Sequence, residues 1–313
     1  MQTHNQKGIF YGLSSGMLWG ASTALTSLVL LAVPFISTNP RLVAPALLLA
    51  FFNDSFSALL MTGLLVRSGD VKATLNALRS KNIGWMVLAA LFGGPLGMRA
   101  YLYAVDAIGA GYTASISSMY PVVAAVLGVL VLKEKLPWYR LLGLLLAVLA
   151  VYGVSQSSQE ISVATQPLGF IAAGLCVLGW ACEVVISSVM MQTTLNSTQA
   201  MCIRQWVCSL AYLVFMLIEG DVIFSVQAVV SQPIIWGIMG IAVIGTFSYL
   251  NFYRAIELIG PVKATGLNVS YSIWAIVFSL LLVGGNFNWL LVVCSGLMIV
   301  GCMLVSKSEG EIK

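Results

Sequence analysis

Long apolar segments are the feature that most constrains the fold of this chain. A helix needs about 20 apolar residues to cross a bilayer. The 313-residue chain is 59% hydrophobic and only 8% charged, whereas soluble domains carry about 25% charged residues. The apolar runs are continuous and do not alternate, which argues against a transmembrane β-barrel. The sequence therefore predicts an all-α polytopic membrane protein with ten transmembrane helices, at residues 8–32, 42–66, 82–105, 108–132, 137–155, 167–191, 197–218, 233–256, 259–283 and 288–306.

Basic side chains fall almost entirely on one side of this arrangement. Connections rich in Lys and Arg stay in the cytoplasm, so both chain termini are expected there. Arg41 is the clearest basic residue on the other side, and Arg99 lies inside the third segment nearby. The net charge of +4 reflects this bias, and no nucleic-acid partner is expected. The basic residues of the first side are Lys7, Arg67, Lys72, Arg79, Lys81, Lys133, Lys135, Arg140, Arg254, Lys263, Lys307 and Lys313.

The two halves of the chain repeat each other. Trp19 in the first segment corresponds to Trp180 in the sixth, and residues 104–109 align without a gap with residues 255–260. The same register places Tyr120 on Tyr271. An odd number of spans in each repeat inverts the second copy and puts the binding site near the membrane midplane. We therefore expect two inverted five-helix repeats, residues 1–155 and 156–313.

Carboxylates stand near the middle of two segments. Glu183 lies three residues after Trp180 in the sixth segment, so both side chains project from one helix face. Asp54 lies in the second segment, whereas Arg99 and Arg204 lie nearer the ends of theirs. A charge at bilayer depth costs on the order of 3 kcal/mol and indicates a wet cavity or a partner. For Asp54 the alternative is an interhelical hydrogen bond or ion pair without a role in binding.

Aromatic side chains accompany these charges. Trp19 and Trp180 lie at the middle of their segments, away from the interfaces where membrane proteins usually place Trp. Both are therefore predicted to line a pocket. Tyrosines also occur in the third and eighth segments, where one face of each helix must turn outward. The candidates there are Tyr101, Tyr103, Tyr249 and Tyr253.

Three short motifs follow one another in a fixed order, at residues 16–20 (GMLWG), 114–121 (ASISSMYP) and 132–136 (LKEKL). With them the chain resembles the drug/metabolite transporter superfamily, EamA-type, over essentially its whole length. The resemblance implies ten spans in two inverted repeats. Residues 52–58 (FNDSFSA) and 178–188 (LGWACEVVISS) are similar to one branch, the bacterial choline permeases of the Lic type. That branch implies an aromatic cage of Trp19, Trp180, one of Tyr101 and Tyr103, and one of Tyr249 and Tyr253.

The resemblance leads to an expected function, the uptake of choline or a similar small quaternary ammonium across the bacterial inner membrane. A quaternary ammonium has no N–H to donate, so ring faces and a negative field must hold it. Glu183 would supply the field, and a proton is the candidate coupling ion. Gly93-Gly94-Pro95 is expected to break the third segment and Pro121 to kink the fourth, which suits the movements of alternating access.

Two alternatives stay open. An exporter of aromatic amino acids would use the same rings for stacking, but the carboxylates Asp54 and Glu183 have no comparably central basic residue beside them in the sequence. A membrane scaffold or lipid-binding protein leaves the central Trp residues unexplained. His4 is the only histidine and no phosphate-binding Gly-rich loop is present, so no enzyme activity, cofactor or metal is expected.

Overall fold

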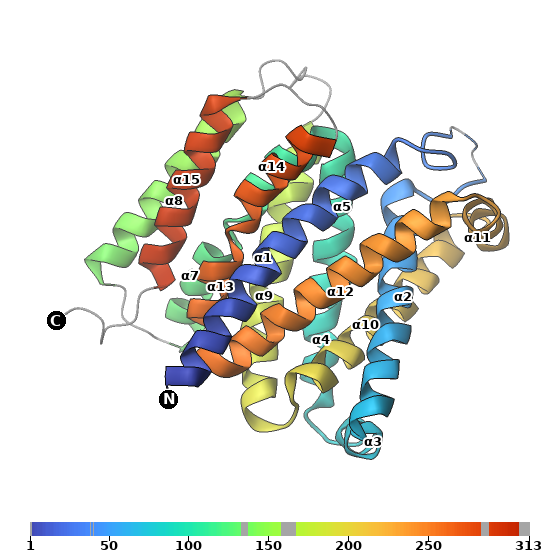
Figure 1. Ribbon diagram of the computed structural model, residues 1–313, viewed down its shortest axis with the longest axis horizontal. Helices are drawn as coiled ribbons and strands as arrows, with labels where there is room; N and C mark the ends of the chain where they lie inside the picture. Colours follow the sequence, from blue (N-terminus) through green and yellow to red (C-terminus); the bar gives the residue numbers. More distant parts are fainter. Residues whose placement is uncertain are drawn as a thin grey trace.

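The computed structural model describes residues 2–37, 39, 41–132, 137–157, 167–282 and 288–306, and every regular element in these ranges is helical (Figure 1). The prediction of an all-α fold is confirmed. The helices are α1 (Gln2–Leu30), α2 (Pro45–Ser68), α3 (Val71–Leu78), α4 (Ile83–Leu91), the π-helix η1 (Phe92–Met98), α5 (Arg99–Ile108), α6 (Ala110–Ser117), α7 (Tyr120–Leu132), α8 (Trp138–Ser157), α9 (Pro167–Thr193), α10 (Ser197–Glu219), α11 (Val222–Val230), α12 (Ile234–Ile259), α13 (Pro261–Asn268), α14 (Tyr271–Leu282) and α15 (Trp289–Ser306).

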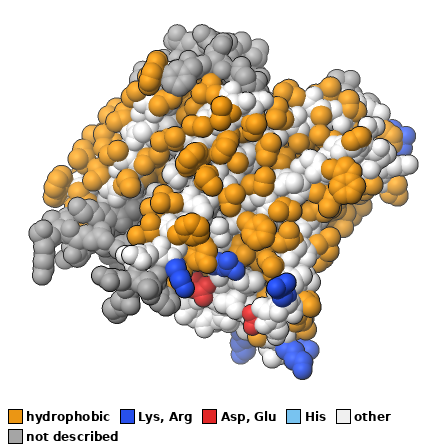
Figure 2. All heavy atoms as spheres, in the orientation of Figure 1, with side chains coloured by type: hydrophobic (Ala, Val, Ile, Leu, Met, Phe, Trp, Pro, Cys, Tyr) orange, Lys and Arg blue, Asp and Glu red, His pale blue; other side chains and the backbone are white. Residues whose placement is uncertain are grey.

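Seven helical stretches in the described ranges are long and apolar enough to cross a membrane. They coincide with the predicted spans one to three and six to nine, while the total of ten stays a prediction. Hydrophobic side chains cover most of the face drawn in Figure 2, and most charged side chains gather toward its lower end. Such a broad apolar surface suits contact with lipid. The seven stretches are Asn5–Leu30, Pro45–Ser68, Ile83–Ile108, Pro167–Thr193, Ser197–Glu219, Ile234–Ile259 and Ala264–Leu282.

The third span is continuous, and the break predicted at Gly93-Gly94-Pro95 is wrong. These residues lie in η1, a π-helical segment that joins α4 to α5. A π-turn widens the helix and absorbs a proline that cannot donate a backbone hydrogen bond. The chain therefore accommodates Pro95 without leaving the helix.

Interrupted helices occur at corresponding places in the two halves. Gly109 (φ 83°, ψ 160°) joins α5 to α6, and Gly260 (φ 82°, ψ 160°) joins α12 to α13. This backbone conformation is essentially restricted to glycine, which explains glycine at both junctions. The next helix then stops after eight residues and restarts, at Tyr120 in the first half and at Tyr271 in the second. Pro121 lies in the first turn of α7, where its missing N–H costs nothing.

Packing places α9 at the centre of the bundle. It lies against η1, α5 and α7, while α1 runs along α12 and α14, and α15 pairs with α8 (Figure 1). Trp180 and Glu183 are buried in the middle of α9. The helix that carries the strongest sequence signal is therefore packed against several others, with its central Trp and Glu inside the bundle.

Two ion pairs join the halves at one end of the bundle. Arg41 in the α1–α2 connection lies 2.7 Å from Asp221 Oδ2, and Arg99 of α5 pairs with Glu219 at the end of α10. The backbone N–H of Phe224 and the Arg41 guanidinium hold the pKa of Asp221 below its usual value. These exposed pairs contribute little stability individually; one joins the α1–α2 connection to the residue before α11, and the other joins α5 to the end of α10.

Candidate functional site

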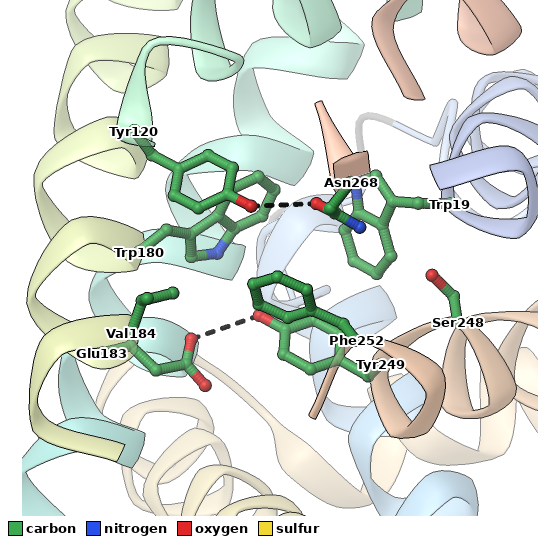
Figure 3. A pocket seen from close by; sticks show the side chains of 9 residues that line it. All are labelled: Trp19, Tyr120, Trp180, Glu183, Val184, Ser248, Tyr249, Phe252 and Asn268. Carbon is green, nitrogen blue, oxygen red and sulfur yellow. Dashed lines mark hydrogen bonds between the residues drawn. The ribbon is translucent and has the colours of Figure 1, made fainter. Parts of the chain in front are cut away.

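A small hollow lies between α9 and α12, close to the middle of both helices. Figure 3 shows Trp180, Glu183 and Val184 reaching it from α9, and Ser248, Tyr249 and Phe252 reaching it from α12. Trp19 of α1, Tyr120 of α7 and Asn268 of α13 complete its wall. The hollow encloses about 30 Å³, which is room for a water molecule and too little for a quaternary ammonium. Its rings are therefore in contact with one another in this conformation.

The aromatic rings meet mostly edge to face. The ring centroids of Trp19 and Trp180 are 5.6 Å apart with their planes at 77°, and Trp19 lies 5.4 Å from Tyr249 at 76°. Tyr120 stands at 89° to Trp180, with the centroids 5.9 Å apart. In an edge-to-face pair the edge of one ring meets the face of the other, so in this conformation the rings cover part of one another's faces. Trp19 Nε1 and Trp180 Nε1 are buried and have no hydrogen-bond partner among the described residues, and Trp180 Nε1 lies close to Gly97 of η1.

Glu183 brings a carboxylate to the hollow, held by three donors. Arg204 Nε donates to Glu183 Oε1 over 2.5 Å, and the Tyr253 hydroxyl donates to the same oxygen over 2.9 Å. The Tyr249 hydroxyl donates to Oε2 over 3.2 Å. Charge-assisted hydrogen bonds of this kind hold a carboxylate in one orientation. The carboxylate therefore stays fixed at the edge of the aromatic wall.

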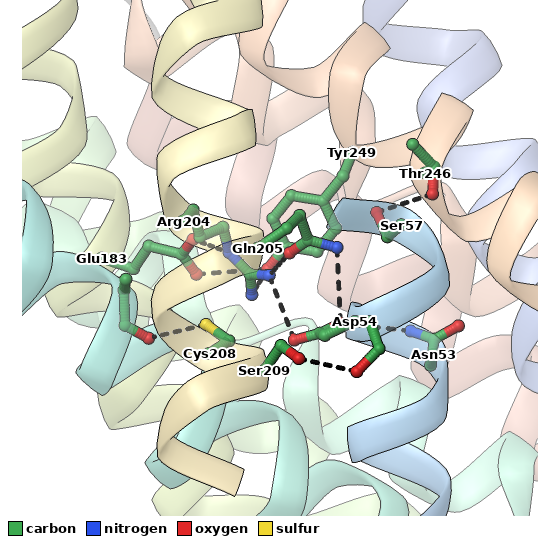
Figure 4. Close-up of polar contacts among 12 residues, drawn as sticks. Asn53, Asp54, Ser57, Glu183, Arg204, Gln205, Cys208, Ser209, Thr246 and Tyr249 are labelled. Atoms are coloured by element: carbon green, nitrogen blue, oxygen red, sulfur yellow. Dashed lines mark hydrogen bonds and ion pairs between the residues drawn. The ribbon is translucent and has the colours of Figure 1, made fainter. Parts of the chain in front are cut away.

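Arg204 connects Glu183 to Asp54 (Figure 4). Its guanidinium nitrogen Nη1 lies 3.7 Å from Asp54 Oδ2, and the guanidinium is fully buried. Asp54 does not line the hollow and receives hydrogen bonds from Asn53 and Gln205. The alternative reading of Asp54, an interhelical ion pair, thus has the better geometric support.

The four candidate tyrosines separate into different roles. Tyr249 lines the hollow, whereas Tyr253 lies beside it, donates to the Glu183 carboxylate and packs against the Tyr249 ring. Tyr101 packs behind Trp180 at a centroid distance of 5.0 Å and shares a 2.6 Å hydrogen bond with Thr23. Tyr103 is 41% exposed on the outer face of α5. Tyr101, Tyr249 and Tyr253 thus all face inward, and only Tyr103 lies away from the site.

Several residues at the site were not among the sequence candidates. Tyr120 was visible in the 114–121 motif and in the repeat, but was not assigned to the wall. Phe252 follows Tyr249 by three residues and so shares its helix face. Asn268 accepts a 2.9 Å hydrogen bond from the Tyr120 hydroxyl, and nothing in the sequence indicated it. The expectation that no central basic residue accompanies the carboxylates is wrong. Arg204 lies nearer one end of its segment, yet in the structure it pairs with Glu183 and lies 3.7 Å from Asp54.

Comparison with known proteins identifies relatives over the whole chain. The model of the EamA-like transporter family matches residues 6–156 and 167–307. Protein LicB of Haemophilus influenzae is 30% identical over 309 residues, which are 98% of this chain and all of that protein. A solved crystal structure has a TM-score of 0.63 at 13% identity and covers 95% of both chains, a similarity of fold alone. The resemblance inferred from the short motifs is therefore confirmed.

Proposed function

Because the chain belongs to the EamA-like transporter family, we propose that it is a secondary transporter for the uptake of choline or a similar small quaternary ammonium. The observation that carries this proposal is the convergence of Trp19, Trp180 and Tyr249 with the Glu183 carboxylate on one hollow between α9 and α12. Two further hollows differ from it, because one is lined by Trp19 without a carboxylate and the other by Asp106 without an indole ring.

The chemistry of the wall suits an onium ion. Ring faces attract a cation by about 2 kcal/mol or more when the site is dry, and Glu183 adds a full negative charge at the edge of the rings. Choline carries such a quaternary nitrogen. The likeness of residues 52–58 and 178–188 to choline permeases points to the same substrate.

Binding requires movement. A hollow of about 30 Å³ cannot hold a quaternary ammonium until Trp19 and Tyr249 separate from Trp180 and Glu183. Trp19 belongs to the first half, whereas Trp180, Glu183 and Tyr249 belong to the second and lie on α9 and α12. Because α1 packs along α12, the hollow opens when these two helices move together away from α9. Alternating access provides that movement, and the ion pairs of Arg41 and Arg99 would have to open when the site faces outward.

The proposed architecture is ten spans in two inverted repeats, residues 1–155 and 156–313. Two cross-half hydrogen bonds support it, Tyr120 to Asn268 at 2.9 Å and Tyr271 to Ser117 at 2.7 Å. In each bond a tyrosine that starts a helix meets the residue three positions before its counterpart. A pseudo-twofold axis between the halves would generate one bond from the other. The matching junctions at Gly109 and Gly260 support the same repeat.

The proposed location is the bacterial inner membrane, with both termini in the cytoplasm. Basic side chains at the connections support this orientation through the positive-inside rule. The chain would act without an enzymatic reaction or a cofactor. A proton is the candidate coupling ion, because a carboxylate that binds a cation can exchange it for a proton. Glu183 is the carboxylate at the hollow.

The exporter of aromatic amino acids is less well supported. Such a substrate needs a free basic group for its carboxylate, and Arg204 is central enough to provide one. Its guanidinium, however, already donates to Glu183, Gln205 and Tyr249 and does not line the hollow. An amino acid would therefore bring its carboxylate toward Glu183 without a free cation to offset the repulsion.

A comparison of ligands tests the proposed function. A ligand that binds only the folded state raises the apparent melting temperature. Choline is expected to stabilise the purified protein more than tryptophan at equal concentration, and to quench the fluorescence of the cage indoles. A larger shift with tryptophan would favour the exporter. No shift with either compound would leave the scaffold reading in place.

Loss of one ring face is expected to weaken choline binding without unfolding the protein. Tyr249→Leu removes the only hydroxylated ring of α12 that lines the hollow, at a cost of about 2 kcal/mol, or roughly thirtyfold in Kd. Tyr249→Phe keeps the ring and should lose much less. The matched control is Tyr103→Leu, the same change at an exposed position, which should leave Kd unchanged. Isothermal titration with choline measures all three, and equal losses at positions 103 and 249 would count against the cage.

A further inference from the structure

Three charged side chains are buried together beside the proposed site. Among the side chains that the structure describes, Asp54, Glu183 and Arg204 are the buried charged ones. They come from α2, α9 and α10, and Arg204 lies between the two carboxylates (Figure 4). Two carboxylates and one guanidinium leave one negative charge in excess. A buried charge without a counter-charge is costly, so the excess creates a demand for one cation.

Arg204 is held so that it cannot itself enter the hollow. Its Nη2 donates to the Tyr249 hydroxyl over 3.0 Å, its Nη1 donates to Gln205, and its Cζ lies 4.2 Å from the centroid of the Tyr249 ring. Tyr249 also lines the hollow. The ring therefore stands between the internal cation and the place where the substrate cation would lie.

We propose that Arg204 is a specificity-determining residue that sets the charge of the site to one negative unit, so that the site accepts ions with one positive charge and rejects those with two. The inference rests on the proposed function and deepens it. Arg204 cancels the charge of one carboxylate, so the remaining negative unit can balance one positive charge on the ligand but not a second. Ring faces attract any positive charge, so the electrostatic limit on the charge of the ligand comes from the two carboxylates and Arg204.

The other polar groups that face the cluster carry no formal charge to alter this count. They are the hydroxyls of Tyr249 and Tyr253 on α12, the amides of Asn53 on α2 and Gln205 on α10, and Cys208 and Tyr212 on α10. The charge of the described cluster thus depends on Asp54, Glu183 and Arg204, each of which can be changed to a neutral residue of similar shape.

A matched pair of ligands tests the proposal. (3-Hydroxypropyl)trimethylammonium has one positive charge, and (3-aminopropyl)trimethylammonium has almost the same size and two charges at neutral pH. The wild-type protein is expected to bind the first at least about tenfold more tightly by isothermal titration. In Arg204→Gln the preference should disappear or reverse, whereas Arg204→Lys should keep it. An unchanged preference in Arg204→Gln would overturn the inference and leave the proposed function standing.

Charge-balanced variants keep the test valid if Arg204→Gln does not fold. Asp54→Asn leaves no excess charge and should lose affinity for the singly charged ligand. Asp54→Asn combined with Arg204→Gln leaves Glu183 alone with one negative charge, so affinity and preference should return toward wild type. Failure of the double variant to bind better than Asp54→Asn would overturn the proposal. A wild-type protein that binds neither ligand nor choline would instead overturn the proposed function, and this inference with it.

Discussion

Replacing Glu183 by glutamine is expected to abolish the binding of choline at concentrations that saturate the wild-type protein. The substitution keeps the size of the side chain and its ability to accept a hydrogen bond from Arg204, so the fold should survive. It removes the negative charge that faces the hollow and leaves Asp54 and Arg204 as a neutral pair. For a cation about 5 Å from a carboxylate, the lost attraction is roughly 3 kcal/mol at an effective dielectric constant of about 20. That corresponds to more than about a hundredfold in Kd.

The matched control for this substitution is Glu257→Gln. Glu257 is exposed in the last turn of α12 and accepts a 3.3 Å hydrogen bond from the backbone N–H of Ser197, so the same chemical change there should leave choline affinity within about twofold, as for other exposed charges. Titration calorimetry or the choline-dependent shift in melting temperature measures both variants. Wild-type affinity in Glu183→Gln would show that the rings alone hold the ligand, and would remove the role proposed for this carboxylate.

Trp19, Trp180 and Glu183 could be identified from the sequence because each lies in the middle of a long apolar segment. All three stand away from the interfaces where such residues are common. The structure brings the two indoles to 5.6 Å from each other and places Glu183 beside them. Their role in binding stays a prediction. Their place in the middle of apolar segments was nevertheless enough to predict that they line a pocket.

The sequence indicates how deep in the membrane a side chain lies more readily than which side of its helix the side chain faces. Tyr101 and Tyr103 differ by two residues and so point to different sides of α5; only packing decides that Tyr101 turns inward and Tyr103 outward. Arg204 was misjudged for the same reason. Its distance from the end of α10 suggested a peripheral side chain, whereas its helix face carries it to Glu183 and Asp54.

The conformation of the backbone at a junction can be predicted from sequence only where a single residue type is able to adopt it. The junctions at Gly109 and Gly260 could be expected, because the aligned repeat places glycine at both and only glycine readily adopts φ near 82° with ψ near 160°. The π-helix at Phe92–Met98 could not. Gly93-Gly94-Pro95 indicates a weakened helix, but the local sequence is compatible with either a break or a π-helical turn. The π-helical segment packs against α9 and α10, and these contacts are not visible in the sequence.

Adding a single methyl group at Gly179 is expected to destabilise the protein strongly and to disturb the site. A Cβ at this position would lie 2.5 Å from the carbonyl oxygen of Phe92 and 2.9 Å from the backbone N and Cα of Gly97. All three atoms belong to the backbone of η1, so no side chain can rotate away. Gly179→Ala must therefore push α9 and η1 apart. Overpacking of this kind costs typically 1–3 kcal/mol, which corresponds to a fall of roughly 5 °C in Tm.

Gly174→Ala is the matched control, because it places the same methyl group on the same helix five residues earlier. No atom lies within 4 Å of a Cβ built there, and alanine in a helix is favoured over glycine by roughly 0.5–1 kcal/mol. Thermal unfolding in detergent should thus give a Tm at or slightly above wild type for Gly174→Ala and a clearly lower one for Gly179→Ala.

Trp180 follows Gly179 directly and packs on Gly97, so the displacement of α9 also moves a wall of the hollow. Choline should then stabilise Gly179→Ala less than wild type, while its effect on Gly174→Ala stays unchanged. Equal Tm values for the two variants would mean that α9 and η1 are not packed this closely in the membrane protein.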